Sequence, residues 1–167
     1  MVFHEEGSGG RWLDMDVRKP SWVVEGVDLD RPNPARIYDY LLGGHHNFAA
    51  DRAAAERMLE LLPHSAEACV VQRVFLRRAI DVCTADGIDQ FLDIGSGLPT
   101  AGNVHDLARA TIPDARVVYV DVDPVVIAHS GQLLKDDPLA TIIEADVRRP
   151  ASILEHEEVR HLLDFSQ

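Results

Sequence analysis

Three aspartates stand at or just after short apolar stretches of the sequence, and their spacing could create one binding site. Asp93 lies within FLDI, Asp121 follows VVYV, and Asp146 follows ATIIEA. If these stretches are parallel strands, their carboxyl ends meet at one edge of a sheet, which is where ligands bind in such folds. A carboxylate there can bind an ammonium group, the hydroxyls of a ribose or the exocyclic amine of adenine. The sequence therefore predicts a site for a nucleoside-containing ligand.

A glycine-containing turn, GSGLPTAG at residues 95–102, follows the first of these stretches directly. Glycines allow the backbone to approach a ligand where a Cβ atom would collide. In the dinucleotide fingerprint GxGxxG the third glycine comes two residues earlier, and here a proline also interrupts the pattern. The spacing favours a ligand without phosphate, whose carboxylate and amine would be bound by amides of the turn and by Asp93. On the glycines alone, an ordinary strand-to-helix turn stays an open alternative.

Each aspartate also has a purely structural alternative. Asp121 could cap the turn after its strand, although Asp123 is the better helix cap because Pro124 follows it. A single acid at the end of a strand, such as Asp146, is common and indicates little by itself. Three such acids on three successive strands are harder to explain as caps, which favours a shared ligand.

The elements that would position these residues alternate along the chain. Strands are predicted at about 90–94, 116–120 and 140–145, and helices at about 103–110, 124–134 and from Pro150 onward. Asn103 and Asp123 are the expected caps of the first two of these helices. Alternating strands and helices are typical of parallel βαβ units, so the sequence predicts an α/β fold.

Three helices are predicted before the first strand. Asn33-Pro34 opens the first, which Gly43-Gly44 ends; the second covers 51–62, and Ser65 caps a longer third helix that reaches Asp86. The third helix carries a broad apolar stripe, expected to face the core, formed by Val70, Val71, Val74, Phe75, Ile80, Val82 and Cys83. Residues 1–32 show no sustained periodicity and are predicted to form a flexible arm.

Composition excludes several classes of function. The chain has 167 residues, 46% of them hydrophobic, which suits one domain with a real core, and a formal net charge of −12. An acidic chain lacks the basic surface of a nucleic-acid groove and is not attracted to anionic membranes. No apolar stretch approaches the roughly 20 residues of a membrane helix. The N-terminus is not a signal peptide, so we expect a cytoplasmic protein.

The sequence contains no motif typical of a metal site or of a hydrolase. The eight histidines show no HExxH or similar spacing, and the two cysteines, Cys69 and Cys83, have no CxxC spacing. No serine lies in a GxSxG motif, so a hydrolase triad is not indicated. We expect no metal site.

Taken together, the motifs resemble those of the bacterial S-adenosyl methyltransferase family, within the class I S-adenosylmethionine-dependent methyltransferases. The resemblance rests on PNPARIYDYLLGG, NFAADR, FLRRA, FLDIGSGLPT and DVDP and covers about residues 32–167. It implies a Rossmann-like sheet preceded by an N-terminal helical region. Only the first three strands of the family's longer sheet are expected here, which suggests a C-terminally truncated chain. Gln72 also departs from the family pattern, in which an asparagine is expected.

The resemblance implies S-adenosyl-L-methionine as the cofactor and assigns residues to its parts. Gly95 and Gly97 would lie behind the methionine part with Asp93 near its amine, Asp121 would bind the ribose, and Asp146 with Val147 would bind the adenine. The YDYLLGG helix and the loop after it would cover the cofactor, which adds Tyr38, Gly43, Gly44 and Asn47 as further candidates. No catalytic base is indicated: Tyr38 and His105 are the only candidates, and His105 is expected on a helix surface.

The resemblance further implies three segments: a flexible arm at 1–32, a helical lid at 33–87 and the N-terminal half of a cofactor-binding domain at 88–167. The implied function is methyl transfer from S-adenosylmethionine to an unknown acceptor. The alternative is a non-catalytic cofactor-binding or regulatory protein that lacks the acceptor-binding half. A nicotinamide dehydrogenase is less well supported because the glycine spacing is wrong. The sequence does not indicate an oligomeric state.

Overall fold

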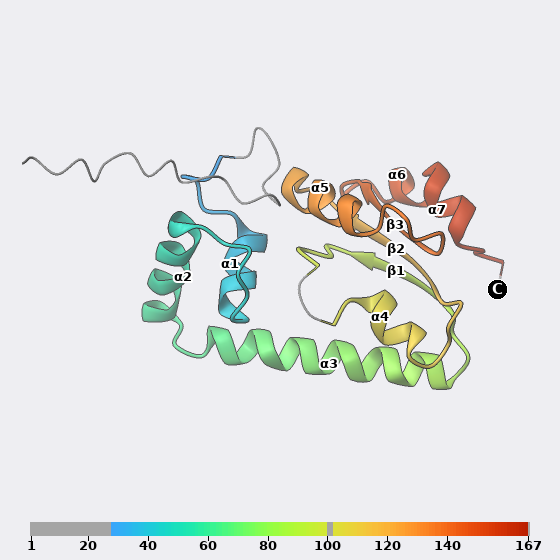
Figure 1. The fold of residues 1–167 in the computed structure, drawn as a ribbon, viewed down its shortest axis with the longest axis horizontal. Coiled ribbons are helices and arrows are strands. Elements are labelled where there is room, and N and C mark those ends of the chain that lie inside the picture. Colours follow the sequence, from blue (N-terminus) through green and yellow to red (C-terminus); the bar gives the residue numbers. More distant parts are fainter. Residues whose placement is uncertain (1–27, 100–101, 167) are drawn as a thin grey trace, which may run out of the picture.

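The sheet has three parallel strands in the order β1-β2-β3, so β2 is central. β1 covers Gln90–Ile94, β2 covers Arg116–Asp121 and β3 covers Ala140–Glu144. The computed structural model describes residues 28–99 and 102–166, so most of the expected N-terminal arm lies outside the described residues. The register pairs Asp93 with Tyr119 and Asp121 with Glu144, which brings the three strand ends to one edge (Figure 1). The predicted α/β fold is confirmed.

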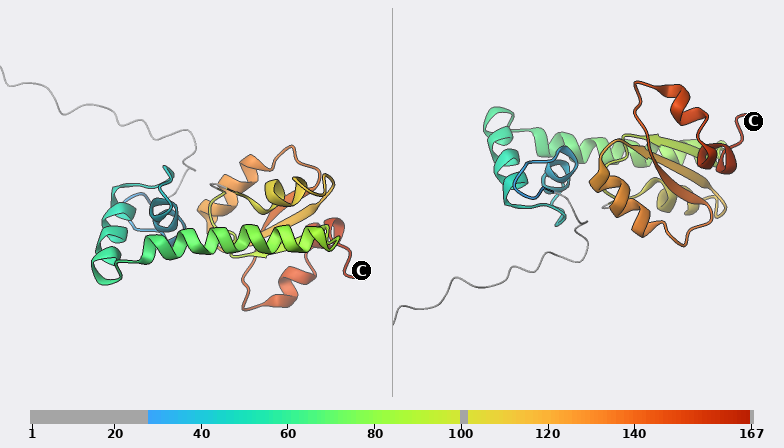
Figure 2. Two further views of the ribbon diagram at one scale, coloured as in Figure 1. Left: turned by 90° about the horizontal axis from the view of Figure 1, so that it is seen from below. Right: turned by 90° about the horizontal axis from the view of Figure 1, so that it is seen from above.

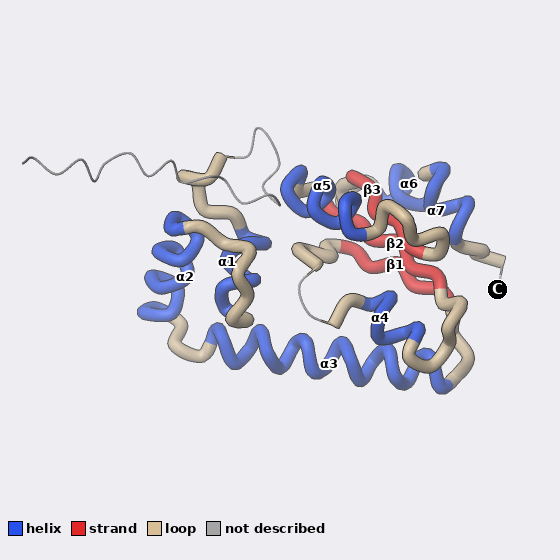
Figure 3. The backbone as a smooth tube through the Cα atoms, viewed as in Figure 1, coloured by secondary structure: helices blue, strands red, loops and turns tan. Residues whose placement is uncertain are grey.

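Helices cover both faces of this sheet. Helices α4 (Val104–Arg109) and α5 (Pro124–Leu133) lie on one side, and α6 (Pro150–Leu154) and α7 (Glu157–Leu162) lie on the other (Figure 2). Figure 3 distinguishes the three strands in red from the helices around them in blue. Such a three-layer arrangement is the expected product of parallel βαβ connections, because each crossover places its helix on a face of the sheet.

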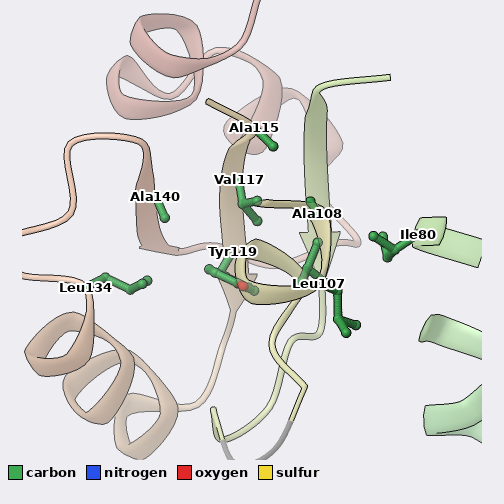
Figure 4. Packing of buried hydrophobic residues seen from close by; sticks show 9 residues of the cluster. Ile80, Leu107, Ala108, Ala115, Val117, Tyr119, Leu134 and Ala140 are labelled. Carbon is green, nitrogen blue, oxygen red and sulfur yellow. The ribbon is translucent and has the colours of Figure 1, made fainter. Parts of the chain in front are cut away.

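Both faces of β2 are buried, which explains its continuous apolar sequence. On one face Val117 and Tyr119 pack against Leu107 and Ala108 of α4 in the cluster shown in Figure 4. On the other face Val118 and Val120 pack with the following buried residues of β3, α6 and α7: Ile143, Ile153, Val159 and Leu162. The central strand therefore joins the two halves of the core.

Three helices precede the sheet: α1 (Pro34–Leu41), α2 (Ala49–Leu61) and α3 (Ser65–Ala85). Leu41, Ala55 and Cys69 pack together where the three helices meet. α3 then continues alongside the sheet, where its Ile80 joins the core cluster around Val117 (Figures 1 and 4). α3 is therefore shared between the helical lobe formed by α1 and α2 and the α/β layer.

The start of α1 lies over the carboxyl edge of the sheet. Ala35 packs against Leu98, Val125 and Val126. In addition, the side-chain amide of Asn33 donates a hydrogen bond to the carboxylate of Asp123, which caps α5 two residues after the end of β2. The helical lobe is thereby attached to the edge at which the three candidate aspartates are gathered.

Two of the predicted helix caps are confirmed. The Asn33 side chain accepts from the backbone N–H of Arg36 at 3.1 Å, and Asp123 accepts from Val125 N–H at 2.9 Å. Ser65 does not cap α3; it is the first helical residue, and its hydroxyl donates to the carbonyl of Leu62. Asn103 precedes α4, but its side chain accepts no backbone N–H there.

The apolar stripe predicted for α3 is largely exposed. Ile80 is buried, but the side chains of Val70, Val71, Val74, Phe75 and Val82 are 50% to 72% exposed. The reason is that the helices and strands packed against α3 contact its other side, where Cys69, Leu76 and Ile80 join the core clusters. Within the described residues, none of the helices is long and apolar enough to cross a membrane.

Candidate functional site

The glycine turn after β1 folds back over the end of β2. Gly95 and Gly97 have φ angles of 77° and 67°, a left-handed conformation that side chains rarely adopt. The N–H groups of Gly95 and Ser96 donate to the carbonyl of Val120, at 2.8 and 3.3 Å. The two glycines are therefore required by the shape of the turn as well as by any ligand that approaches it.

Asp121 holds this turn in place. One oxygen of its carboxylate accepts from Gly97 N–H at 2.9 Å, and the other accepts from Val122 and Asp123 N–H at 2.8 and 3.0 Å. A carboxylate has about four acceptor positions, so the oxygen bound to Gly97 keeps room for one further donor. The structural and ligand-binding interpretations of Asp121 are thus compatible with each other.

Asp93 lies beside Asp121 on the same face of the sheet. It is the register partner of Tyr119, whose side chain faces α4. Partial burial raises the pKa of the Asp93 carboxyl, and the guanidinium of Arg73 on α3 opposes part of that increase. An ammonium group at this position would favour the ionised form of Asp93 further.

Asp146, the third acid, lies two residues beyond β3 and is held by its own neighbour. The carboxylate accepts from Arg148 Nε at 2.9 Å and from the Arg148 backbone N–H at 2.9 Å. These hydrogen bonds lower the pKa of Asp146 from 3.8 to about 2. The adjacent Val147 is 60% exposed, whereas the Asp146 side chain is only 14% exposed, so the edge of the sheet is open at Val147 and largely covered at Asp146.

Replacing Arg148 with glutamine is expected to raise the pKa of Asp146 from about 2 toward 3.8, because the charged hydrogen-bond donor is lost. In the wild type, the lowered pKa of Asp146 stabilises the folded state above pH 3.8, and this contribution is lost as the pH falls toward 2. The Arg148→Gln variant lacks this contribution at every pH. A carboxyl NMR titration measures this pKa. The Arg57→Gln variant, on the exposed face of α2, is the control and should leave it unchanged. If the pKa of Asp146 is unchanged in Arg148→Gln, Arg148 is not the residue that lowers it.

A cavity of about 660 Å³ lies between the helical lobe and α3. Its wall includes Asp39, Gly44 and His46 from α1 and the loop after it, and Arg73 and Arg77 from α3, together with Val70, Val74 and Leu107. This volume is within the range of small-molecule sites. Gly43 and Gly44, two of the candidates for covering the cofactor, line this cavity, whereas the three strand-end aspartates do not. Arg73 of the cavity wall is near enough to Asp93 to lower the pKa of that carboxyl.

Asp39 is a feature of this cavity that the sequence analysis missed. Its carboxylate is 1% exposed; Oδ2 accepts from His46 N–H at 2.7 Å and from Asn47 Nδ2 at 2.9 Å. Oδ1 has no hydrogen-bond donor among the described residues, although His46 Nδ1 lies 3.9 Å away. The sequence did carry a signal for this buried acid. Asp39 stands between apolar positions of an amphipathic helix, five residues before Gly44.

Tyr38 and Asn47, the two predicted site residues of the helical lobe, both contact residues of the cavity wall. The guanidinium of Arg73 lies over the ring of Tyr38, with its Cζ atom 5.3 Å from the centroid of the ring. The amide of Asn47 donates to Asp39 and to the carbonyl of Gly44, and its oxygen accepts from Arg52. Asn47 therefore fastens the loop after α1 onto Asp39, while Tyr38 supports a residue of the cavity wall.

Replacing Gly44 with alanine is expected to destabilise the fold by about 1–3 kcal/mol, because the added methyl overpacks a buried site. The new Cβ atom would lie 2.1 Å from Asp39 Oδ1, and Asp39 is held by its hydrogen bonds. Denaturant unfolding measures the change. Gly131 in α5 has open space at the same position, so Gly131→Ala is the control and should be neutral or stabilising. Equal effects at the two sites would contradict this account.

His105 does not lie on a helix surface, which corrects the expectation from sequence. Its Nδ1 is 2.7 Å from the hydroxyl of Tyr119, and that hydroxyl also accepts from the His105 backbone N–H at 3.0 Å. Partial burial lowers the pKa of His105, and burial raises the pKa of Tyr119. The physical reason is that the tyrosine hydroxyl, placed inside by β2, needs a polar partner.

Comparisons with known proteins agree with this geometry. A family model described as S-adenosyl methyltransferase matches residues 12–167. A crystal structure of a proposed methyltransferase from Thermobifida fusca YX is 47% identical, with a TM-score of 0.84, over 88% of this chain and 56% of that one. A DUF574 family protein from Streptomyces avermitilis MA-4680 is 40% identical, with a TM-score of 0.78, over 84% and 55%. No curated protein matches. The chain thus spans little more than half the length of these structures.

Proposed function

The chain belongs to the S-adenosyl methyltransferase family, and from this premise we propose that it binds S-adenosyl-L-methionine and serves in the transfer of its methyl group to an acceptor. The observation that supports the proposal best is the glycine turn held by Asp121, with Asp93 beside it, at the carboxyl edge of the sheet. This edge is where parallel α/β sheets bind nucleoside-containing ligands.

The cofactor would lie along this edge from β1 to β3. Gly95 and Gly97 would support its methionine part, with the ammonium group near Asp93. The free acceptor position of Asp121 would bind a ribose hydroxyl, and Asp146 with the backbone of Val147 would bind the adenine. For this, the adenine amine must share the Asp146 carboxylate with Arg148. Val147 is open to that approach, whereas the Asp146 side chain is only 14% exposed, so the exposed side chain of Arg148 would have to move aside.

The helical lobe would form the cover of this site, and the segment 88–167 would carry the cofactor. Asn33 bonds to Asp123 at the edge of the sheet, and Ala35 packs against Leu98. Tyr38 and Asn47 would then act indirectly, by positioning Arg73 and Asp39 in the cavity wall.

Catalysis would depend mainly on positioning. Bound S-adenosylmethionine supplies a methyl group that is already activated by its positively charged sulfur. The residues of the chain need to fix that methyl in line with an acceptor atom and to exclude water, which accounts for a large part of the rate in such reactions. No described residue stands out as a general base for the acceptor, and the acceptor itself is not identified.

A comparison of thermal unfolding with two ligands tests the proposal. S-adenosylhomocysteine is expected to raise the melting temperature, because a ligand that binds only the folded state stabilises it, while NADH should leave it unchanged. A shift with NADH and none with S-adenosylhomocysteine would favour a dehydrogenase. A shift with S-adenosylhomocysteine but no methyl transfer to any offered acceptor would favour a binding or regulatory role for this chain.

A further inference from the structure

Arg73 of α3 presents a buried donor that nothing in the described structure satisfies. Its Nε atom is buried and has no hydrogen-bond partner among the described residues. The guanidinium lies over the ring of Tyr38, which fixes its position at the wall of the 660 Å³ cavity. Buried polar groups without partners are uncommon in proteins, and each one needs a physical explanation, such as a functional role or a bound ion.

A negative charge lies near this guanidinium without neutralising it. Arg73 is close enough to Asp93 to lower the pKa of that carboxyl, yet the two form no ion pair in residues 28–99 and 102–166. α3 and β1 therefore present opposite charges to the same region, beside the end of the glycine turn. A zwitterionic amino-acid group requires such a pair of separated charges.

The N–H groups at the start of the glycine turn are already in use. Those of Gly95 and Ser96 donate to the carbonyl of Val120, and that of Gly97 donates to Asp121. The expectation that amides of this turn bind a ligand carboxylate is therefore not supported for these three residues. A carboxylate at this position needs a different donor.

We propose that Arg73 binds the carboxylate of the cofactor's amino-acid end, while Asp93 binds its ammonium group. This inference rests on the proposed function and adds to it a residue that determines which cofactor analogues bind. The planar guanidinium can donate two parallel hydrogen bonds to a carboxylate, which is a strong and directional contact. Arg77 also lines the cavity, but it is exposed, whereas Arg73 is half-buried and supported by Tyr38.

The test compares S-adenosylmethionine with S-adenosyl-methylthiopropylamine, which lacks only the carboxylate, by calorimetric titration of the wild type and of Arg73→Gln. The wild type is expected to bind S-adenosylmethionine about tenfold or more tightly than the decarboxylated ligand, because a hydrogen bond to a charged group is lost. Arg73→Gln is expected to lose this preference while it keeps the wild-type affinity for the decarboxylated ligand. Arg78→Gln, an exposed neighbour on α3, is the control and should keep the preference.

Several results would overturn the inference. Equal affinity of the wild type for both ligands would show that the carboxylate is not recognised, whether or not the variant folds. A preference that persists in Arg73→Gln would assign the recognition to another residue. If Arg73→Gln loses affinity for both ligands to the same extent, the role of Arg73 is purely structural. If the wild type binds neither ligand, the proposed function itself fails.

Discussion

Replacing Asp121 with asparagine is expected to weaken the binding of S-adenosylhomocysteine by about 100-fold, because a charge-assisted hydrogen bond and an ordered turn are lost together. The wild-type carboxylate accepts from Gly97 N–H and would bind a ribose hydroxyl with the same oxygen. Asparagine leaves one acceptor oxygen for the N–H groups of Val122 and Asp123 and directs an NH₂ group at Gly97. Calorimetric titration measures the affinity.

The control for this prediction is Asp114→Asn, which makes the same chemical change in an exposed loop before β2, away from the carboxyl edge. Its affinity should equal that of the wild type. Unfolding of the ligand-free Asp121→Asn protein shows how much of the effect comes from a weakened turn. An Asp121→Asn protein that is folded and binds S-adenosylhomocysteine as tightly as the wild type would remove Asp121 from the site.

Replacing Asp51 with alanine is expected to lower the free energy of unfolding by about 3–5 kcal/mol, because it leaves a buried guanidinium without its counter-charge. Asp51 and Arg36 are 0% and 1% exposed, and Arg36 Nε donates to Asp51 at 2.7 Å. The same carboxylate accepts from the backbone N–H groups of Asn33 and Phe48, both at 2.8 Å. Asp51 therefore joins the starts of α1 and α2.

Chemical denaturation of the ligand-free protein measures this effect. Asp51→Asn retains one acceptor oxygen and should lose less stability than Asp51→Ala, which keeps the prediction testable if the alanine variant does not fold. Glu60→Ala, at an exposed position of the same helix, is the control and should change the stability by less than about 0.5 kcal/mol. A loss in Asp51→Ala no greater than in Glu60→Ala would contradict the role given to the buried ion pair.

Local signals predicted the elements of the fold well. β1 is predicted at 90–94 and is found at Gln90–Ile94, because a short apolar stretch that ends at a glycine has the length and the flanking residue of a buried strand. The caps Asn33 and Asp123 were predicted because each precedes a proline that favours the first helical turn. The helix expected from Pro150 is interrupted, since His156 accepts from Glu158 N–H and starts α7.

Contacts between distant elements could not be predicted in the same way. The periodicity of α3 shows an apolar face but not whether another element covers it, and most of that face is exposed. Asp39, Arg73 and the His105–Tyr119 pair become visible only when α1, α3, α4 and β2 are placed together. The strand-end aspartates were found because parallel strands bring their ends to one edge, whatever the loops between them do.

Calorimetric titration of the wild-type protein with S-adenosylhomocysteine tests the central claim most directly. If the carboxyl edge of β1, β2 and β3 is a cofactor site, the titration should show saturable heat with one ligand bound per chain. If protein that unfolds cooperatively shows no heat with S-adenosylhomocysteine or with S-adenosylmethionine, the assignment of this edge as a cofactor site is wrong.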